Sequence, residues 1–62
     1  MIGDKIKEAR EEKGISQYRL AQLTGINRST IKRYEENAIK KISLDNLIKI
    51  CNALEIDVKE II

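Results

Sequence analysis

The chain has 62 residues, a length that allows one domain with a small core. With 42% hydrophobic and 35% charged residues, it is too apolar for a disordered chain and too charged for a membrane span. It has no histidine, a single cysteine and no phosphate-loop spacing among its three glycines. Imidazole catalysis, an internal disulfide and the common zinc sites are therefore excluded. We expect a cytoplasmic protein that is not an enzyme and that uses no metal, cofactor, small-molecule ligand or membrane.

The net charge of +2 is unevenly distributed along the chain. Residues 28–41 contain five basic and two acidic side chains, whereas the remainder has seven basic and eight acidic ones. The whole positive excess therefore falls in one segment. A basic patch on a nearly neutral body is typical of a surface that binds phosphates.

Five short helices are predicted, and four of them share a start signal. In each case isoleucine precedes a good N-cap residue, and leucine or isoleucine stands four positions after it, which is the spacing of a hydrophobic staple. The four caps are Ser16, Asn27, Ser43 and Asp57. Asp57 and Glu60 also have the spacing of a capping box.

In chain order, the predicted helices cover residues 2–13, 17–24, 28–36 and 44–54, and the fifth is a last short turn over residues 58–62. Gly14 and Gly25 end the first two, and Asn37, which tolerates a left-handed backbone, ends the third. Residues 56–59 alternate like a strand, but the run is too short and has no partner. We therefore expect an all-α fold.

Helical wheels predict the side chains that face the core. They are Ile2, Ile6, Ala9, Leu20, Leu23, Thr24, Ile31, Tyr34, Leu44, Leu47, Ile48, Ile50, Cys51 and Leu54. The helix over 44–54 has the widest apolar face and is expected to be central. Cys51 lies within that face and is interpreted as a small buried hydrophobe. Arg10 and Glu35 lie at the edges of inward faces, and we expect them to pair across the core.

The helices over 17–24 and 28–36 are joined by little more than Gly25 and Ile26, so a large angle between them is expected. This is the helix-turn-helix arrangement, placed at residues 16–36. The polar residues at the start and outer side of its second helix are Asn27, Arg28, Ser29, Lys32 and Arg33. Arginine can read guanine and asparagine adenine in a major groove. The alternative is a solvated helix surface, but the helix pair and the local charge excess favour nucleic acid.

The stretch from Ser16 to Glu35 resembles the helix-turn-helix of phage-repressor-like (Cro/cI, Xre-type) DNA-binding proteins. The features that carry the resemblance are Gln17, Leu20-Ala21, Gly25, Ile31 and Tyr34-Glu35. The tail from Ser43 to Leu54 is similar to the fourth helix of that family. The resemblance therefore spans nearly the whole chain.

The resemblance implies a compact five-helix, lambda-repressor-like domain over residues 1–62, with its third helix in the major groove of double-stranded DNA. The implied base contacts are Asn27, Arg28, Ser29, Lys32 and Arg33. The implied phosphate contacts are Gln17, Asn37, Lys40 and Lys41. We add Tyr18, because the helical wheel places it on the exposed side; the alternative is that Tyr18 only covers the protein surface. The sequence departs from the family at Asn37, where Gly is common, and at Ile42, where Pro is common. Glu36 adds a carboxylate that opposes phosphate binding.

The expected function is that of a sequence-specific transcriptional regulator, a repressor that occupies a promoter. One such module covers little DNA, so we expect a homodimer on a near-palindromic operator. The expected dimer interface is Ile48, Val58, Ile61 and Ile62, although these residues could instead only close the core. The alternative function is a protein-interaction module or an antitoxin with the same fold. Strong salt dependence of DNA binding would favour the regulator.

Overall fold

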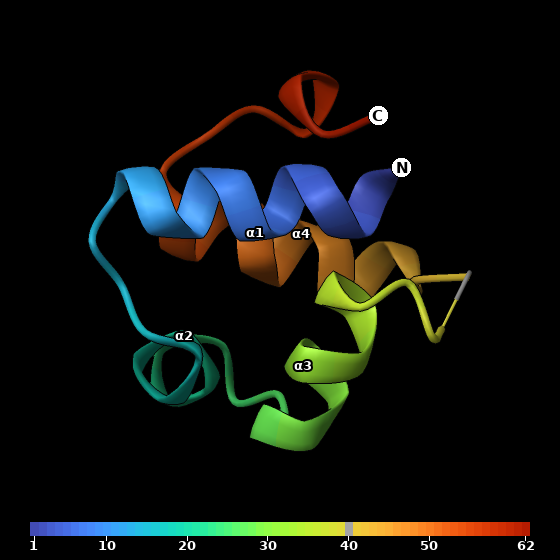
Figure 1. Cartoon of the computed structure of the whole chain (residues 1–62). Helices are drawn as coiled ribbons and strands as arrows, with labels where there is room; N and C mark the ends of the chain where they lie inside the picture. Colours follow the sequence, from blue (N-terminus) through green and yellow to red (C-terminus); the bar gives the residue numbers. More distant parts are fainter. Residues whose placement is uncertain (40) are drawn as a thin grey trace.

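The computed structural model describes residues 1–39 and 41–62. Its elements are α1 (Ile2–Glu12), α2 (Gln17–Thr24), α3 (Arg28–Glu35), α4 (Leu44–Leu54) and the 3-10 helix η1 (Val58–Glu60) (Figure 1). The described residues contain no strand, so the chain is all-α there. The prediction of a fifth α-helix was wrong. Such a short segment gains too few hydrogen bonds to repay nucleation, and it forms a single 3-10 turn instead.

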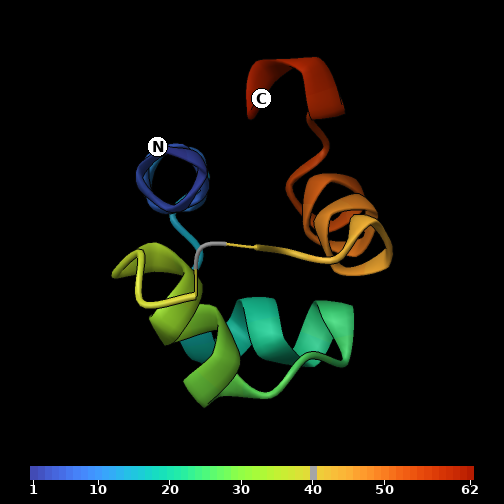
Figure 2. The same ribbon diagram turned by 90° about the vertical axis from the view of Figure 1, so that its right-hand side faces the viewer.

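The helix-turn-helix and the two chain ends lie on opposite sides of the molecule. Figures 1 and 2 both place α2 and α3 below, and η1 with both chain ends above. α4 contacts α1, α2 and η1, while α1 also packs on α3. This confirms the central place predicted for the helix over 44–54. α2 and α3 cross steeply after their short link, as the sequence predicted (Figure 1).

The predicted helix starts are confirmed at the level of single hydrogen bonds. The side chains that accept a backbone N–H at an element start are Ser16, Asn27, Ser43 and Asp57. The side-chain oxygen of Asn27 lies 2.8 Å from the N–H nitrogen of Ser29. Glu60 accepts from the N–H of Asp57 at 2.9 Å and completes the predicted capping box. The first residues of α2, α3, α4 and η1 are therefore set locally.

The helix ends use a left-handed backbone, and most of them were predicted. Gly14 (φ 68°) follows α1, Gly25 (φ 75°) ends α2, and Asn37 (φ 59°) follows α3. Glu55 takes the same conformation (φ 56°) at the end of α4. Its residue type does not predict this, because glutamate has a Cβ that disfavours positive φ.

The core draws on all four α-helices, on the link between α2 and α3, and on the residue after η1. The buried apolar side chains among the described residues are Ile6, Leu20, Ile26, Ile31, Tyr34, Leu47, Ile50, Cys51, Leu54 and Ile61. Three inward assignments were wrong, because Leu23, Leu44 and Ile48 are 45%, 66% and 39% exposed. Leu23 and Leu44 lie in a terminal turn of their helix, where less of the neighbouring structure covers them. Ile48 is not among the side chains that pack against the core.

A buried glycine lets α1 approach the end of α3. A Cβ placed on Gly3 would lie 2.0 Å from the carbonyl oxygen of Tyr34 and 2.5 Å from the side-chain oxygen of Asn37. Any other residue at this position would push the two helices apart. Gly3 therefore fixes how α1 sits over α3.

Candidate nucleic-acid interface

A buried ion pair between α1 and α3 fixes the orientation of α3. Arg10 Nε donates to Glu35 Oε2 at 2.7 Å, and Arg10 Nη2 donates to Glu35 Oε1 at 3.0 Å. Arg10 Nη1 donates to the carbonyl oxygen of Ile15 at 2.7 Å, just before α2. The hydrogen bond to Glu35 raises the pKa of Arg10 above its ordinary value, although burial acts in the opposite direction. The predicted pair is confirmed, and it joins three parts of the chain.

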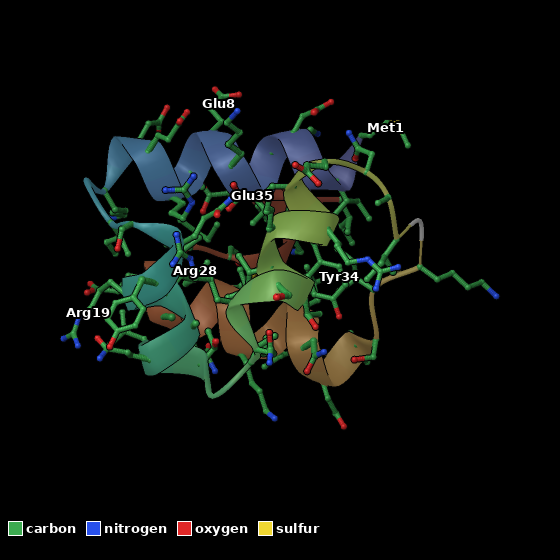
Figure 3. All side chains as sticks on the ribbon, turned by 60° about the horizontal axis from the view of Figure 1, so that its bottom comes forward. Met1, Glu8, Arg19, Arg28, Tyr34 and Glu35 are labelled. Carbon is green, nitrogen blue, oxygen red and sulfur yellow. The ribbon has the colours of Figure 1, made fainter. Side chains whose placement is uncertain are left out.

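Gln17 extends this network to the first residue of α2. Its side-chain Nε2 donates to Glu35 Oε1 at 3.0 Å, the same oxygen that accepts from Arg10. Figure 3, which turns α2 and α3 toward the viewer, shows Glu35 between α3 and α1, whereas Arg19 points outward from α2. Wheel positions predicted the Arg10–Glu35 pair but missed the bond to Gln17, which depends on how α2 and α3 pack.

The opposite side of α3 carries the residues for which base contacts were predicted. All of them are exposed: Asn27, Arg28, Ser29, Lys32 and Arg33. The ion pairs found among the described residues involve none of the three basic ones. The side-chain oxygen of Asn27 is used in capping α3, so its NH₂ group is the part left to donate. The face is thus rich in donors, and Ile31, Tyr34 and Glu35 anchor it from behind.

The residues predicted to contact phosphates lie on both sides of this face. Tyr18, on the first turn of α2, is 57% exposed. After α3, the amide nitrogen of Asn37 donates to Asp4 Oδ1 at 3.1 Å. Lys41 is exposed, whereas Lys40 lies outside the described residues. Sequence reasoning missed that the side-chain amides of Gln17 and Asn37 are both bound to carboxylates.

The residues predicted to form a dimer interface differ in exposure. Ile62 is 67% exposed and Ile48 is 39% exposed, while Val58 is half-buried. Ile61 is 2% exposed and belongs to the core. It offers almost no surface to a partner, because the 3-10 turn directs it inward. Ile61 therefore closes the core, which was the alternative to a place in the dimer interface.

The described part of the chain offers neither a metal site nor a membrane span. No group of three or more histidine, cysteine or acidic side chains there could hold a metal ion. None of the helices there has the length and apolarity needed to cross a bilayer.

The steeply crossed pair α2 and α3, with an exposed basic face on α3, is the arrangement of a helix-turn-helix protein. The profile of the helix-turn-helix family matches residues 6–61. The chain belongs to this family, in its Xre/Cro-like form, as the resemblance predicted.

Two solved structures are similar over nearly their whole length. One is the restriction-modification controller protein C.AhdI from Aeromonas hydrophila, 36% identical, with a TM-score of 0.93 over 98% of this chain and 91% of that chain. The other is SinR, the master regulator for biofilm formation, in complex with DNA. It is 36% identical, with a TM-score of 0.92 over 95% of this chain and 94% of that chain. A search of curated proteins gave no match. The chain has the fold of DNA-binding transcriptional regulators.

Proposed function

We propose that this chain binds double-stranded DNA in a sequence-specific manner with α3 in the major groove, and that it represses transcription by occupying a promoter. The observation that carries the proposal is the exposed, donor-rich face of α3 on a helix anchored from behind by the core. A major groove admits one α-helix. The complex of the similar protein SinR with DNA supports duplex DNA as the partner.

Bases are read from the outer face of α3 in this proposal. Arg28 and Arg33 are the main readers, because a guanidinium can donate two hydrogen bonds to guanine O6 and N7. Lys32 and Ser29 lie between them and contact bases or nearby phosphates. Asn27 donates its NH₂ group from the start of the helix, since its oxygen caps α3.

Phosphates are bound on both sides of α3. The first N–H groups of α2 have no carbonyl partner within the helix, so they favour an anion beside Gln17 and Tyr18. Asn37 and Lys41 serve the same purpose after α3. These contacts fix the position of α3 on the duplex and carry no base preference of their own.

A homodimer on a near-palindromic operator completes the proposal. Figure 1 shows the first turn of α4 and both chain ends toward the same edge of the molecule. The exposed apolar side chains on α4 and at the C-terminus are Leu44 (66% exposed), Ile48 (39%) and Ile62 (67%). Together with Val58, they supply the apolar contact between the two copies. Light scattering at rising concentration, with and without duplex, should give twice the monomer mass. A monomer under both conditions would contradict the dimer.

Selection from a random duplex pool tests the proposed base readout. We expect the parent to enrich a near-palindrome, with Arg28→Ala and Arg33→Ala each relaxing the preference at particular positions by about 1–3 kcal/mol. Lys59→Ala removes the same charge from η1, on the opposite side of the molecule, and should leave the selected sequence unchanged. Failure to enrich any sequence, with weak binding that disappears at moderate salt, would contradict the proposal and favour a protein-interaction module.

A further inference from the structure

Glu35 is a buried carboxylate directly behind the proposed DNA surface. It is 5% exposed, and its two oxygens accept three hydrogen bonds, two from Arg10 and one from Gln17. A lone carboxylate there would repel an approaching phosphate. The two-pronged pairing with Arg10 offsets that charge, so the carboxylate can serve as an acceptor beside an anion site.

We propose that Glu35, held in place by Arg10, is a positioning residue for DNA binding that orients the Gln17 amide toward a DNA phosphate. The inference rests on the proposed function. The Gln17 amide nitrogen carries two hydrogens. Nε2 donates one of them to Glu35 Oε1, 3.0 Å away, which leaves the second hydrogen for a phosphate oxygen at the start of α2.

The hydrogen bonds among Arg10, Glu35 and Gln17 preorganise the proposed contact between Gln17 and a phosphate. A glutamine side chain has several rotatable bonds, and fixing it only on binding would lower the affinity. Here the hydrogen bond to a charged acceptor fixes it before DNA arrives. Because the same carboxylate belongs to α3, the phosphate contact on α2 and the base-reading face on α3 share one rigid frame. Loss of Glu35 should therefore weaken the phosphate contact even when the fold survives.

The test must separate this role from a structural one. Removing Arg10 or Glu35 alone would leave a buried charge without a partner and would endanger the fold. The double variant Arg10→Met/Glu35→Leu instead replaces the ion pair by apolar side chains of similar volume, a change that often preserves stability. It also removes the acceptor for Gln17. Thermal unfolding establishes that this variant is folded before its DNA binding is measured.

The decisive measurement is a double-mutant cycle on DNA affinity, using fluorescence anisotropy and one selected duplex. In the parent, Gln17→Ala should raise Kd roughly tenfold, as expected for losing a hydrogen bond to a charged group. In the Arg10→Met/Glu35→Leu background, Gln17→Ala should change Kd by less than about twofold, because the amide is no longer positioned. Gln22→Ala, an exposed amide on the same helix, is the matched control and should leave Kd within about twofold of the parent.

Each contrary outcome has its own meaning. An equal loss from Gln17→Ala in both backgrounds would overturn the positioning role and leave the proposed function intact. No effect of Gln17→Ala in the parent would overturn the Gln17 contact and the positioning role with it. A parent that binds no duplex would refute the proposed function itself.

A second measurement needs no variant. The Gln17 side-chain NH₂ group should have a high NMR order parameter in the free protein, little changed by DNA. A mobile group that becomes ordered only on binding would overturn the proposal.

Discussion

Gln17 and Asn37 flank α3, and each donates its side-chain amide to a carboxylate, yet their surroundings differ. Gln17 donates to the buried Glu35, which is also paired with Arg10. Asn37 donates to the exposed Asp4, whose other oxygen lies 3.6 Å from the N-terminal ammonium. Burial rather than the type of partner determines what each pair does. An exposed pair adds little stability, whereas one member of a buried pair cannot be removed without a large cost.

The largest effect is expected from breaking the buried Arg10–Glu35 pair. Arg10→Met should lower the free energy of unfolding by about 3–5 kcal/mol, because Glu35 is left as a buried charge without its cation. Adding Glu35→Leu should recover most of the loss. Urea unfolding followed by circular dichroism measures both. A single variant as stable as the parent would contradict the buried pair.

The contact between α1 and α3 predicts an effect of intermediate size. Gly3→Ala should cost about 1–3 kcal/mol, because its Cβ would overlap the carbonyl oxygen of Tyr34. Glu8→Ala on the same helix is the control, since Figure 3 shows Glu8 pointing away from the body of the molecule. The control should stay within about 0.5 kcal/mol of the parent in the same unfolding experiment. An unchanged midpoint for Gly3→Ala would mean that the two helices are farther apart.

The exposed pair predicts a small effect. Asp4→Ala removes the carboxylate that holds Asn37, and should change the free energy of unfolding by less than about 0.5 kcal/mol. The same urea titration measures it beside Arg10→Met. A loss as large as that of Arg10→Met would show that burial does not explain the difference between the two pairs.

The buried thiol of Cys51 gives a further test of what burial does to a side chain. Burial raises the pKa of its thiol above the ordinary value, and the charges of Asp57 and Glu60 act in the same direction. At pH 8 the folded protein should therefore hold less thiolate than free cysteine does, on a side chain that is 1% exposed. Mass spectrometry should detect alkylation by iodoacetamide in urea but not in native buffer. Rapid labelling of the folded protein would contradict this placement.

The local part of the fold was predictable from the sequence. The bounds of α2 and α4 agree with the predicted ones, because caps such as Ser16 and Ser43 and the turn at Gly25 act within a few residues. The buried Arg10–Glu35 pair was also predictable, since a charged residue on an inward face needs a partner.

What could not be predicted depends on tertiary contacts. The exposure of Leu23 and Leu44 is decided by which helices cover them, and a helical wheel does not contain that information. The inward placement of Ile61 and the bond from Gln17 to Glu35 arise in the same way, from elements that meet only in the folded chain. The residues proposed to contact DNA and the Arg10–Glu35 pair behind them could be named from the sequence, whereas the hydrogen bond from Gln17 to that pair could not.

The outer face of α3 is the proposed DNA surface, and an NMR titration tests this most directly. A duplex from the selected pool is added to ¹⁵N-labelled protein, and amide shifts are followed by residue. We expect the largest changes at residues 27–33 and at the first turn of α2, with small changes in η1 and on the outer side of α1. The largest changes in η1 or on the outer side of α1, with residues 27–33 unperturbed, would contradict it.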